Sequence, residues 1–345
     1  MTPDRSPPDR SPSELGPAER RPPRFPAPQF PPHQPKLFAS TPPAIFPPIL
    51  GLLGLVLALR RAAAGTGFGA GFAELAAGAV LALWLAAVVA IKVKGLRRPG
   101  VLIEDMRPLP GRAGLAAASM SGMAAGAVIA LYQPLIGLVL LWGSLAAHAV
   151  LLALLVVSLS RQPRAAWRVN PTLHLSLVGF IVAAPALAQM GWSHSAGVIF
   201  WVTLPLAVAI WVASVFDLAR HVPPAPLRPL LAMHLSPAAL LSITAMGLGW
   251  RDLGLGLAVL SAGLAVVLLA AGRWITASGF SPMWGAFTFP LVAFASALLV
   301  QGGVAAEVGL VVALAALGIV PVIAWKVLML WPGNRLAQKT GAAEA

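Results

Sequence analysis

The chain lacks cysteine and has few charged residues. None of its 345 residues is a cysteine, which excludes disulfides, thiolate metal sites and cysteine nucleophiles. Only 10% of the residues are charged, against roughly a quarter in a soluble domain. With 58% hydrophobic residues and a mean hydropathy of +0.83, the composition is that of a polytopic membrane protein. We therefore attribute the net charge of +13 to membrane topology rather than to nucleic-acid binding.

Carboxylates are also missing from the middle of the apolar segments. Glu74, Asp217 and Glu307 lie near the ends of predicted spans, where interfacial water can solvate them. A carrier driven by protons or sodium would be expected to hold Asp or Glu deeper in the membrane. The sequence also holds no cluster of metal-ligating residues. We therefore expect no metal, no cofactor and no enzymatic activity.

Three histidines lie inside predicted spans, namely His148, His174 and His234. Taken singly, each is interpreted as a hydrogen-bonded packing residue. His174 and His234 are retained as candidates for a pH-sensitive role, because histidine titrates near physiological pH.

Ten apolar segments are long enough to cross a bilayer, which requires about 20 residues. They are predicted at 42–59, 67–91, 113–132, 134–159, 172–190, 195–217, 226–246, 252–272, 282–300 and 305–331. Short and longer connections alternate between them. The predicted fold class is therefore an all-α integral membrane protein, with ten transmembrane helices arranged as five helical hairpins.

The basic residues orient these spans. With the N-terminus in the cytoplasm, every Lys and Arg of the 24 falls in a cytoplasmic segment except Arg60, Arg61 and Arg251. We expect a multi-pass protein of a bacterial inner (plasma) membrane with both termini in the cytoplasm. The predicted domain division is a disordered Pro/Arg-rich cytoplasmic tail at 1–38, a membrane domain at 39–332 and a short cytoplasmic tail at 333–345.

The odd-numbered spans carry most of the helix breakers. The breakers include Pro47, Pro48, Gly51, Gly54, Gly179, Pro185, Pro229, Pro237, Pro282 and Pro290. Broken backbone at membrane depth is tolerated where it is buried in protein or lines a watery cavity. The pattern favours an inner ring of odd spans with the even spans outside it. The alternative, in which the prolines only kink ordinary packed helices, stays open.

Several motifs resemble one family of transporters. They are "FPPILGLLGLVLALR" (Phe46–Arg60), "EDMRP" (Glu104–Pro108), "NPTLHLSLVGFIVAAPALA" (Asn170–Ala188), "PLRPLLAMHLSP" (Pro226–Pro237) and "FSPMWGAFTFPLVAFA" (Phe280–Ala295). Over about residues 40–330 the chain is similar to the tellurite-resistance/dicarboxylate transporter family, which includes the plant slow-type anion channels. The AFTFP motif is the most specific part of this resemblance.

The resemblance implies a homotrimer in which each subunit has ten helices, as five hairpins, around its own central pore. It implies that Phe289 occludes this pore and that Gly51 faces Phe289 from the first span, whereas Phe287 is expected to be a packing residue. The other residues expected to line or kink the pore are Pro48, Gly122, Gly179, Pro185, Pro237, Thr288 and Pro290.

The leading functional hypothesis is a passive or weakly gated, voltage-independent anion channel or exporter. A pore without fixed carboxylates does not repel anions, so small inorganic or organic anions are the expected substrates, with the lipid bilayer as the surrounding medium. The alternative is a proton-coupled carrier of a dicarboxylate, tellurite or sulfite that uses His174 or His234. A membrane enzyme or scaffold without transport activity is the third class considered.

Overall fold

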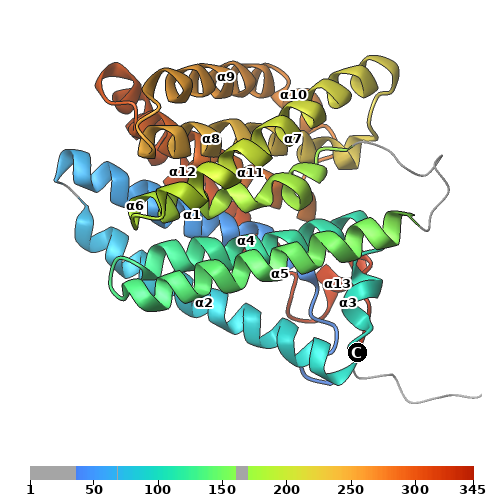
Figure 1. Cartoon of the computed structure of the whole chain (residues 1–345). Coiled ribbons are helices and arrows are strands. Elements are labelled where there is room, and N and C mark those ends of the chain that lie inside the picture. The colour runs from blue at the N-terminus through green and yellow to red at the C-terminus, as the bar shows by residue number, and fades with distance from the viewer. Residues whose placement is uncertain (1–35, 68, 161–169) are drawn as a thin grey trace, which may run out of the picture. The chain divides into compact units, whose positions relative to one another are not determined.

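The computed structural model describes residues 36–67, 69–160 and 170–345 (Figure 1). Within these ranges all regular structure is helical. The tail predicted at 1–38 lies almost entirely outside the described residues. In chain order the elements are η1 (Pro43–Ile45), α1 (Phe46–Thr66), α2 (Ala70–Arg97), α3 (Val101–Asp105), α4 (Leu109–Ile129), α5 (Pro134–Ser160), η3 (His174–Val178), η4 (Gly179–Val182), α6 (Ala184–Gln189), α7 (Ser193–Arg220), η5 (Ala225–His234), α8 (Leu235–Gly247), α9 (Arg251–Ala270), α10 (Gly272–Ile275), η6 (Pro282–Trp284), α11 (Gly285–Leu299), α12 (Gly303–Leu328) and α13 (Arg335–Thr340).

Nine helical segments of the described chain are long and apolar enough to cross a membrane. They coincide with nine of the ten predicted spans. The exception is the span predicted at 172–190, where the apolar helical stretch is the shorter His174–Gln189. This stretch consists of the π turn η3, the 3-10 turn η4 and the short helix α6. Pro185 contributes to the break because it has no N–H to continue an α-helical ladder from the preceding turn.

Most prolines of the buried segments lie where a helix starts. Pro47 and Pro48 are in the first turn of α1, and Pro237 is in the first turn of α8. A proline in the first turn removes an N–H that has no partner within the helix, so its cost there is small. Pro290 differs, because it lies inside α11. Helix interiors of the exposed set also contain proline, at Pro205 in α7 and Pro321 in α12.

Burial divides the long helical segments into two sets. The odd-numbered predicted spans are the buried ones: their most apolar windows are 72% buried in α1, 72% in α4, 89% in η5–α8 and 61% in η6–α11. The corresponding windows of α2, α5, α7, α9 and α12 are only 17% to 33% buried. The exposed set carries large apolar side chains such as Val139, Phe216 and Val266 on its surface, as lipid-facing helices do.

The buried segments contact one another in a closed circuit. In sequence order α1 contacts α4, α4 contacts η3 and η4, α6 contacts α8, and α8 contacts α11. The circuit closes because α11 packs against α1. Each exposed helix packs on its neighbour in the chain, as Figure 1 shows for α5 along α4 and α9 along α8. The buried segments therefore surround a common axis.

The C-terminal segment packs onto one end of this bundle. Residues 333–345, predicted as a short tail, include α13 and belong to the same compact unit as the helices before them. The Lys94 ammonium donates to the Asp105 carboxylate at 2.7 Å and to the Thr41 carbonyl at 3.0 Å, and both charged side chains are fully buried. The other Asp105 oxygen accepts the backbone N–H of Ala343 at 2.8 Å. One buried carboxylate thus joins α2, α3 and the C-terminal segment.

We predict that Asp105→Ala lowers the stability of the protein strongly. The change leaves the Lys94 ammonium buried without its counter-ion, which typically costs about 3–5 kcal/mol. The matched control is Glu104→Ala at the neighbouring residue, which removes a partly exposed ion pair with Arg98. Thermal unfolding in detergent should show a large loss for Asp105→Ala and little change for Glu104→Ala. Equal losses would contradict the assignment.

Candidate functional site

A wide cavity of about 190 Å³ lies on the axis of the bundle. All five buried segments contribute to its wall. The lining residues are Gly54, Leu57, Arg60, Arg61 and Ala64 of α1, Ala124 and Ala127 of α4 with Leu131 after it, Val182, Pro185, Ala186 and Gln189 of η4 and α6, Leu240 and Ile243 of α8, and Phe289, Val292, Ala293 and Ser296 of α11. No acidic residue of the described chain lines this cavity.

A second, narrow cavity of about 20 Å³ lies on the other side of Phe289. One water molecule needs roughly 10–15 Å³, so this space is close to the smallest that admits water. It also draws on all five segments. Its lining residues are Pro47 and Leu50 of α1, Ala117 and Met120 of α4, Leu175 of η3, Met233 and Ser236 of η5 and α8, and Gly285, Ala286, Phe289 and Pro290 of α11.

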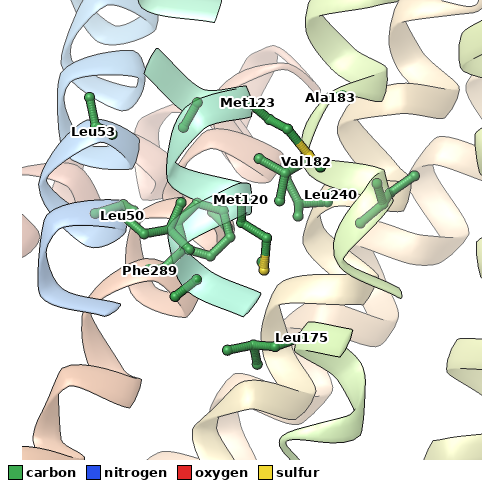
Figure 2. Close-up of a cluster of buried hydrophobic side chains, with 14 of the residues drawn as sticks. Leu50, Leu53, Met120, Met123, Leu175, Val182, Ala183, Leu240 and Phe289 are labelled. Atoms are coloured by element: carbon green, nitrogen blue, oxygen red, sulfur yellow. The ribbon is translucent and has the colours of Figure 1, made fainter. Parts of the chain in front are cut away.

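Phe289 separates the two spaces. Among the described residues it is the only one that lines both cavities. Its side chain is 8% exposed, and Figure 2 shows the ring beside Leu50 and Met120, with Val182 and Leu240 across from it. Apart from the Ser236 hydroxyl, the side chains around the narrow cavity are apolar. A narrow apolar constriction excludes water and raises the free energy of an ion within it.

The lining residues recur at helical spacing. On α1 they follow steps of three and four residues from Pro47 through Leu50, Gly54 and Leu57 to Arg61. Residues at such steps share one face of a helix. The same spacing holds on α4 and on α8 with η5; the α4 positions are Ala117, Met120, Ala124 and Ala127, and those on η5 and α8 are Met233, Ser236, Leu240 and Ile243. Each of these helices therefore turns one continuous face to both cavities.

Gly54, rather than Gly51, faces the Phe289 ring. A Cβ atom added at Gly54 would lie 3.1 Å from Cδ2 of Phe289. At Gly51 the added Cβ would lie 2.2 Å from the Oγ1 atom of Thr288. The contact expected between Gly51 and Phe289 is therefore replaced by one between Gly51 and Thr288. The physical reason is the helical spacing, since Gly51 lies one residue beyond Leu50, on the face of α1 that packs on α11.

Thr288 and Pro48 also lie at this helix contact. The fully buried Thr288 hydroxyl bonds to the Gly285 carbonyl at 2.7 Å and lies 3.2 Å from the Pro47 carbonyl. Pro48 lies beside Gly285, because a Cβ atom added at Gly285 would be 3.2 Å from the Cδ atom of Pro48. Neither Thr288 nor Pro48 lines either cavity.

The remaining predicted residues fall into two groups. Pro185 lines the wide cavity and Pro290 the narrow one. Gly122, Gly179 and Pro237 line neither. A Cβ added at Gly122 would lie 2.3 Å from the Ser144 hydroxyl, and one added at Gly179 would lie 2.7 Å from the His148 ring. Ser144 and His148 belong to α5, so both glycines allow α5 to approach the inner segments.

The histidines lie outside these two cavities. His174 Nε2 and His234 Nδ1 are 2.9 Å apart, so the two buried rings share a hydrogen bond. His234 also lines a third cavity of about 90 Å³ beside α7, with Asp217 among its lining residues. His148 is bonded through Nδ1 to the Ser119 hydroxyl at 2.7 Å. The structure thus brings His174 and His234 together, outside both cavities that Phe289 lines.

The arginines of the wide cavity were not among the predicted site residues. Arg60 and Arg61 appeared in the sequence only as exceptions to the distribution of basic residues. That exception was the available signal, because a cation placed against the topological trend requires another explanation. Gly54 could also have been found, since it lies on one helical face with Pro47 and Leu50.

A comparison with models of protein families identifies a family that the chain matches. A family model described as SLAC1, voltage-dependent anion channel, matches residues 40–331. It spans all five lining segments of both cavities. No match is found among curated protein sequences. The description attaches voltage dependence to the family, whereas voltage-independent conduction by this chain stays a prediction.

We predict that Gly51→Ala destabilises the protein although Gly51 lies outside both cavities. The added methyl group would overlap the buried Thr288 side chain, and overpacking of this kind typically costs about 1–3 kcal/mol. Gly78→Ala on α2 is the matched control, because nothing lies within 4 Å of a Cβ added there. Thermal unfolding in detergent should distinguish the two variants. A Gly51→Ala protein as stable as Gly78→Ala would contradict the packing.

Proposed function

Since the chain belongs to the SLAC1 family of voltage-dependent anion channels, whose members move anions across membranes, we propose that it conducts small anions through a pore closed by Phe289. The single observation that carries the proposal is that Phe289 lines both axial cavities. The two spaces would form one path if this ring moved aside. The family is one of transporters and channels, in agreement with the expectation that the protein is not an enzyme.

The electrostatics of the path favour anions over cations. Neither cavity is lined by a described Asp or Glu, and the wide cavity holds two arginines. A path without described carboxylates offers a cation no opposite charge, and the arginines raise the local concentration of anions. An apolar ring can close the path without any charged group, because an ion would have to lose its hydration shell to pass a dewetted constriction.

We propose ten membrane crossings, with the segment containing His174–Gln189 as the fifth. Its support comes from the positions of its two ends: Leu175 lines the narrow cavity and Gln189 the wide one. This segment therefore runs along the axis as α1 does between Leu50 and Arg61. Ten crossings arranged as five hairpins would leave both termini on one side, which the basic residues assign to the cytoplasm.

A homotrimer in a bacterial inner membrane is retained as part of the proposal, because the resemblance implies it. The apolar faces of α2, α5, α7, α9 and α12 would then meet lipid or neighbouring subunits. Chemical cross-linking of the protein in membranes tests the oligomeric state.

We predict that Phe289→Ala raises anion flux. Removal of the ring joins the two cavities and admits water, and a roughly tenfold increase would correspond to a barrier lowered by about 1.4 kcal/mol. Chloride efflux from liposomes, or current across a planar bilayer, measures this change. Cation flux should stay low.

Phe287→Ala is the matched control for this experiment. Phe287 is half-buried on the same helix, packs edge-on against Trp284 with 5.7 Å between ring centroids, and lines neither cavity. Its removal should leave the flux near the wild-type value. An unchanged flux in Phe289→Ala, with the protein shown to be folded and inserted, would overturn the gate assignment.

The proton-coupled carrier of a dicarboxylate, tellurite or sulfite is the second candidate. It would require a proton site on the substrate path, but His174 and His234 lie outside both axial cavities. We therefore predict that chloride flux does not follow an imposed pH gradient, and that His174→Gln and His234→Gln preserve this independence. Liposome flux with and without the gradient tests it. Flux that scales with the gradient and loses this dependence in the variants would favour the carrier.

A further inference from the structure

Arg61 is a cation without a carboxylate partner on the wall of the wide cavity. Its Nη1 atom lies 3.3 Å from the Ser296 hydroxyl oxygen, and no ion pair joins it to any described Asp or Glu. The neighbouring Arg60 differs. Its guanidinium donates two hydrogen bonds to Glu74, at 2.9 Å and 2.8 Å, and one to the Val128 carbonyl. The positive charge of Arg60 is thus matched within the protein, and that of Arg61 is not.

The surroundings of Arg61 offer little to stabilise its charge. The residues that line the wide cavity with it are mostly Gly, Ala, Leu, Val and Ile. The polar groups among them are the Ser296 hydroxyl and the Gln189 amide, apart from the already paired Arg60. An isolated charge in apolar surroundings is costly, and a guanidinium remains charged in proteins. Among the described residues no Asp or Glu supplies the counter-charge of Arg61, so the site can accept a negative charge from a bound ion.

Topology does not account for this residue. Lys and Arg placed for orientation accumulate at the cytoplasmic ends of spans. The C-terminal segment packs at the end of the bundle where Thr41, just before α1, contacts Lys94. Arg61 lies toward the opposite end of α1. A basic residue on the non-cytoplasmic side opposes the orientation that the other Lys and Arg residues specify. A role in the cavity therefore explains Arg61 better than a role in topology.

We propose that Arg61, with the Ser296 hydroxyl, forms a binding site for a monovalent anion in the wide cavity. The inference rests on the proposed function, whose path it supplies with a site in the cavity that the Phe289 ring also lines. The guanidinium presents several N–H donors, which suits a halide or a planar oxyanion such as nitrate. The Ser296 hydroxyl hydrogen has no acceptor among the described residues and can donate to the same ion.

The charge of the site selects monoanions over dianions. One unmatched guanidinium balances one negative charge. A sulfate or dicarboxylate would bring a second charge, and the cavity wall that the structure describes holds no further unpaired cation to balance it. Burial of an unpaired charge is unfavourable. The volume of about 190 Å³ leaves room for a few water molecules around a small anion.

The site can be tested by equilibrium binding, independently of flux. Sodium bromide is titrated into the purified protein in detergent, and bromide NMR line broadening reports bound ion. We expect Arg61→Gln to raise the half-saturating bromide concentration at least tenfold, equivalent to about 1.4 kcal/mol. Arg61→Lys, which keeps the charge, should stay closer to wild type, and Ser296→Ala should be intermediate. Sodium nitrate should displace bromide, whereas sodium sulfate at equal ionic strength should not.

Arg251→Gln provides the matched control. Arg251 is exposed at the start of α9, so its removal changes the net charge equally but leaves the cavity wall intact. Equal titrations for wild type, Arg61→Gln and Arg251→Gln would overturn the proposed site, as would displacement by sulfate. If Phe289→Ala fails to raise flux while Arg61→Gln still abolishes bromide binding, the gate is wrong and the site stands.

Discussion

The close approach of α1 and α11 is the contact on which the arrangement of the bundle depends. It closes the circuit of buried segments, and it is possible because Gly51 and Gly54 present no side chain where Thr288, Phe289 and Val292 lie. Between helices in lipid, small residues supply tight van der Waals packing in place of a hydrophobic driving force. A wider spacing here would move α11 and displace Phe289 from the axis between the two cavities.

Charge is distributed along this axis in a way that suits anion transport. Described carboxylates are absent from both cavity walls, and the buried Lys94–Asp105 pair lies away from them, where it joins α2, α3 and the C-terminal segment. The narrow cavity offers almost only apolar groups, so its barrier follows from dehydration. The wide cavity offers one unmatched guanidinium. An anion that enters would thus meet an attractive site before it meets the apolar constriction.

Much of the fold could be predicted because lipid imposes strong constraints on sequence. Nine of the ten predicted spans correspond to long helices, since length and hydropathy alone specify such segments. The buried character of the odd spans followed from their Gly and Pro content. The span at 172–190 is the exception: its composition resembles that of the others, but its backbone changes between π, 3-10 and α geometry. Hydropathy does not encode such changes, and along this stretch Gly179 lies close against the His148 ring of α5.

The sequence by itself determined the class of protein, the approximate positions of nine of its long helices and the family to which it belongs, because hydropathy and motifs are properties of neighbouring residues. Only the tertiary structure decided which face of each helix meets the axis. Gly51 and Gly54 are the same residue type about one turn apart, yet Gly51 packs against Thr288 and Gly54 against Phe289. Likewise, Arg60 and Arg61 are adjacent, but only Arg60 reaches Glu74. The physical reason is that each residue advances a helix by about 100°, so packing assigns neighbouring residues to different partners.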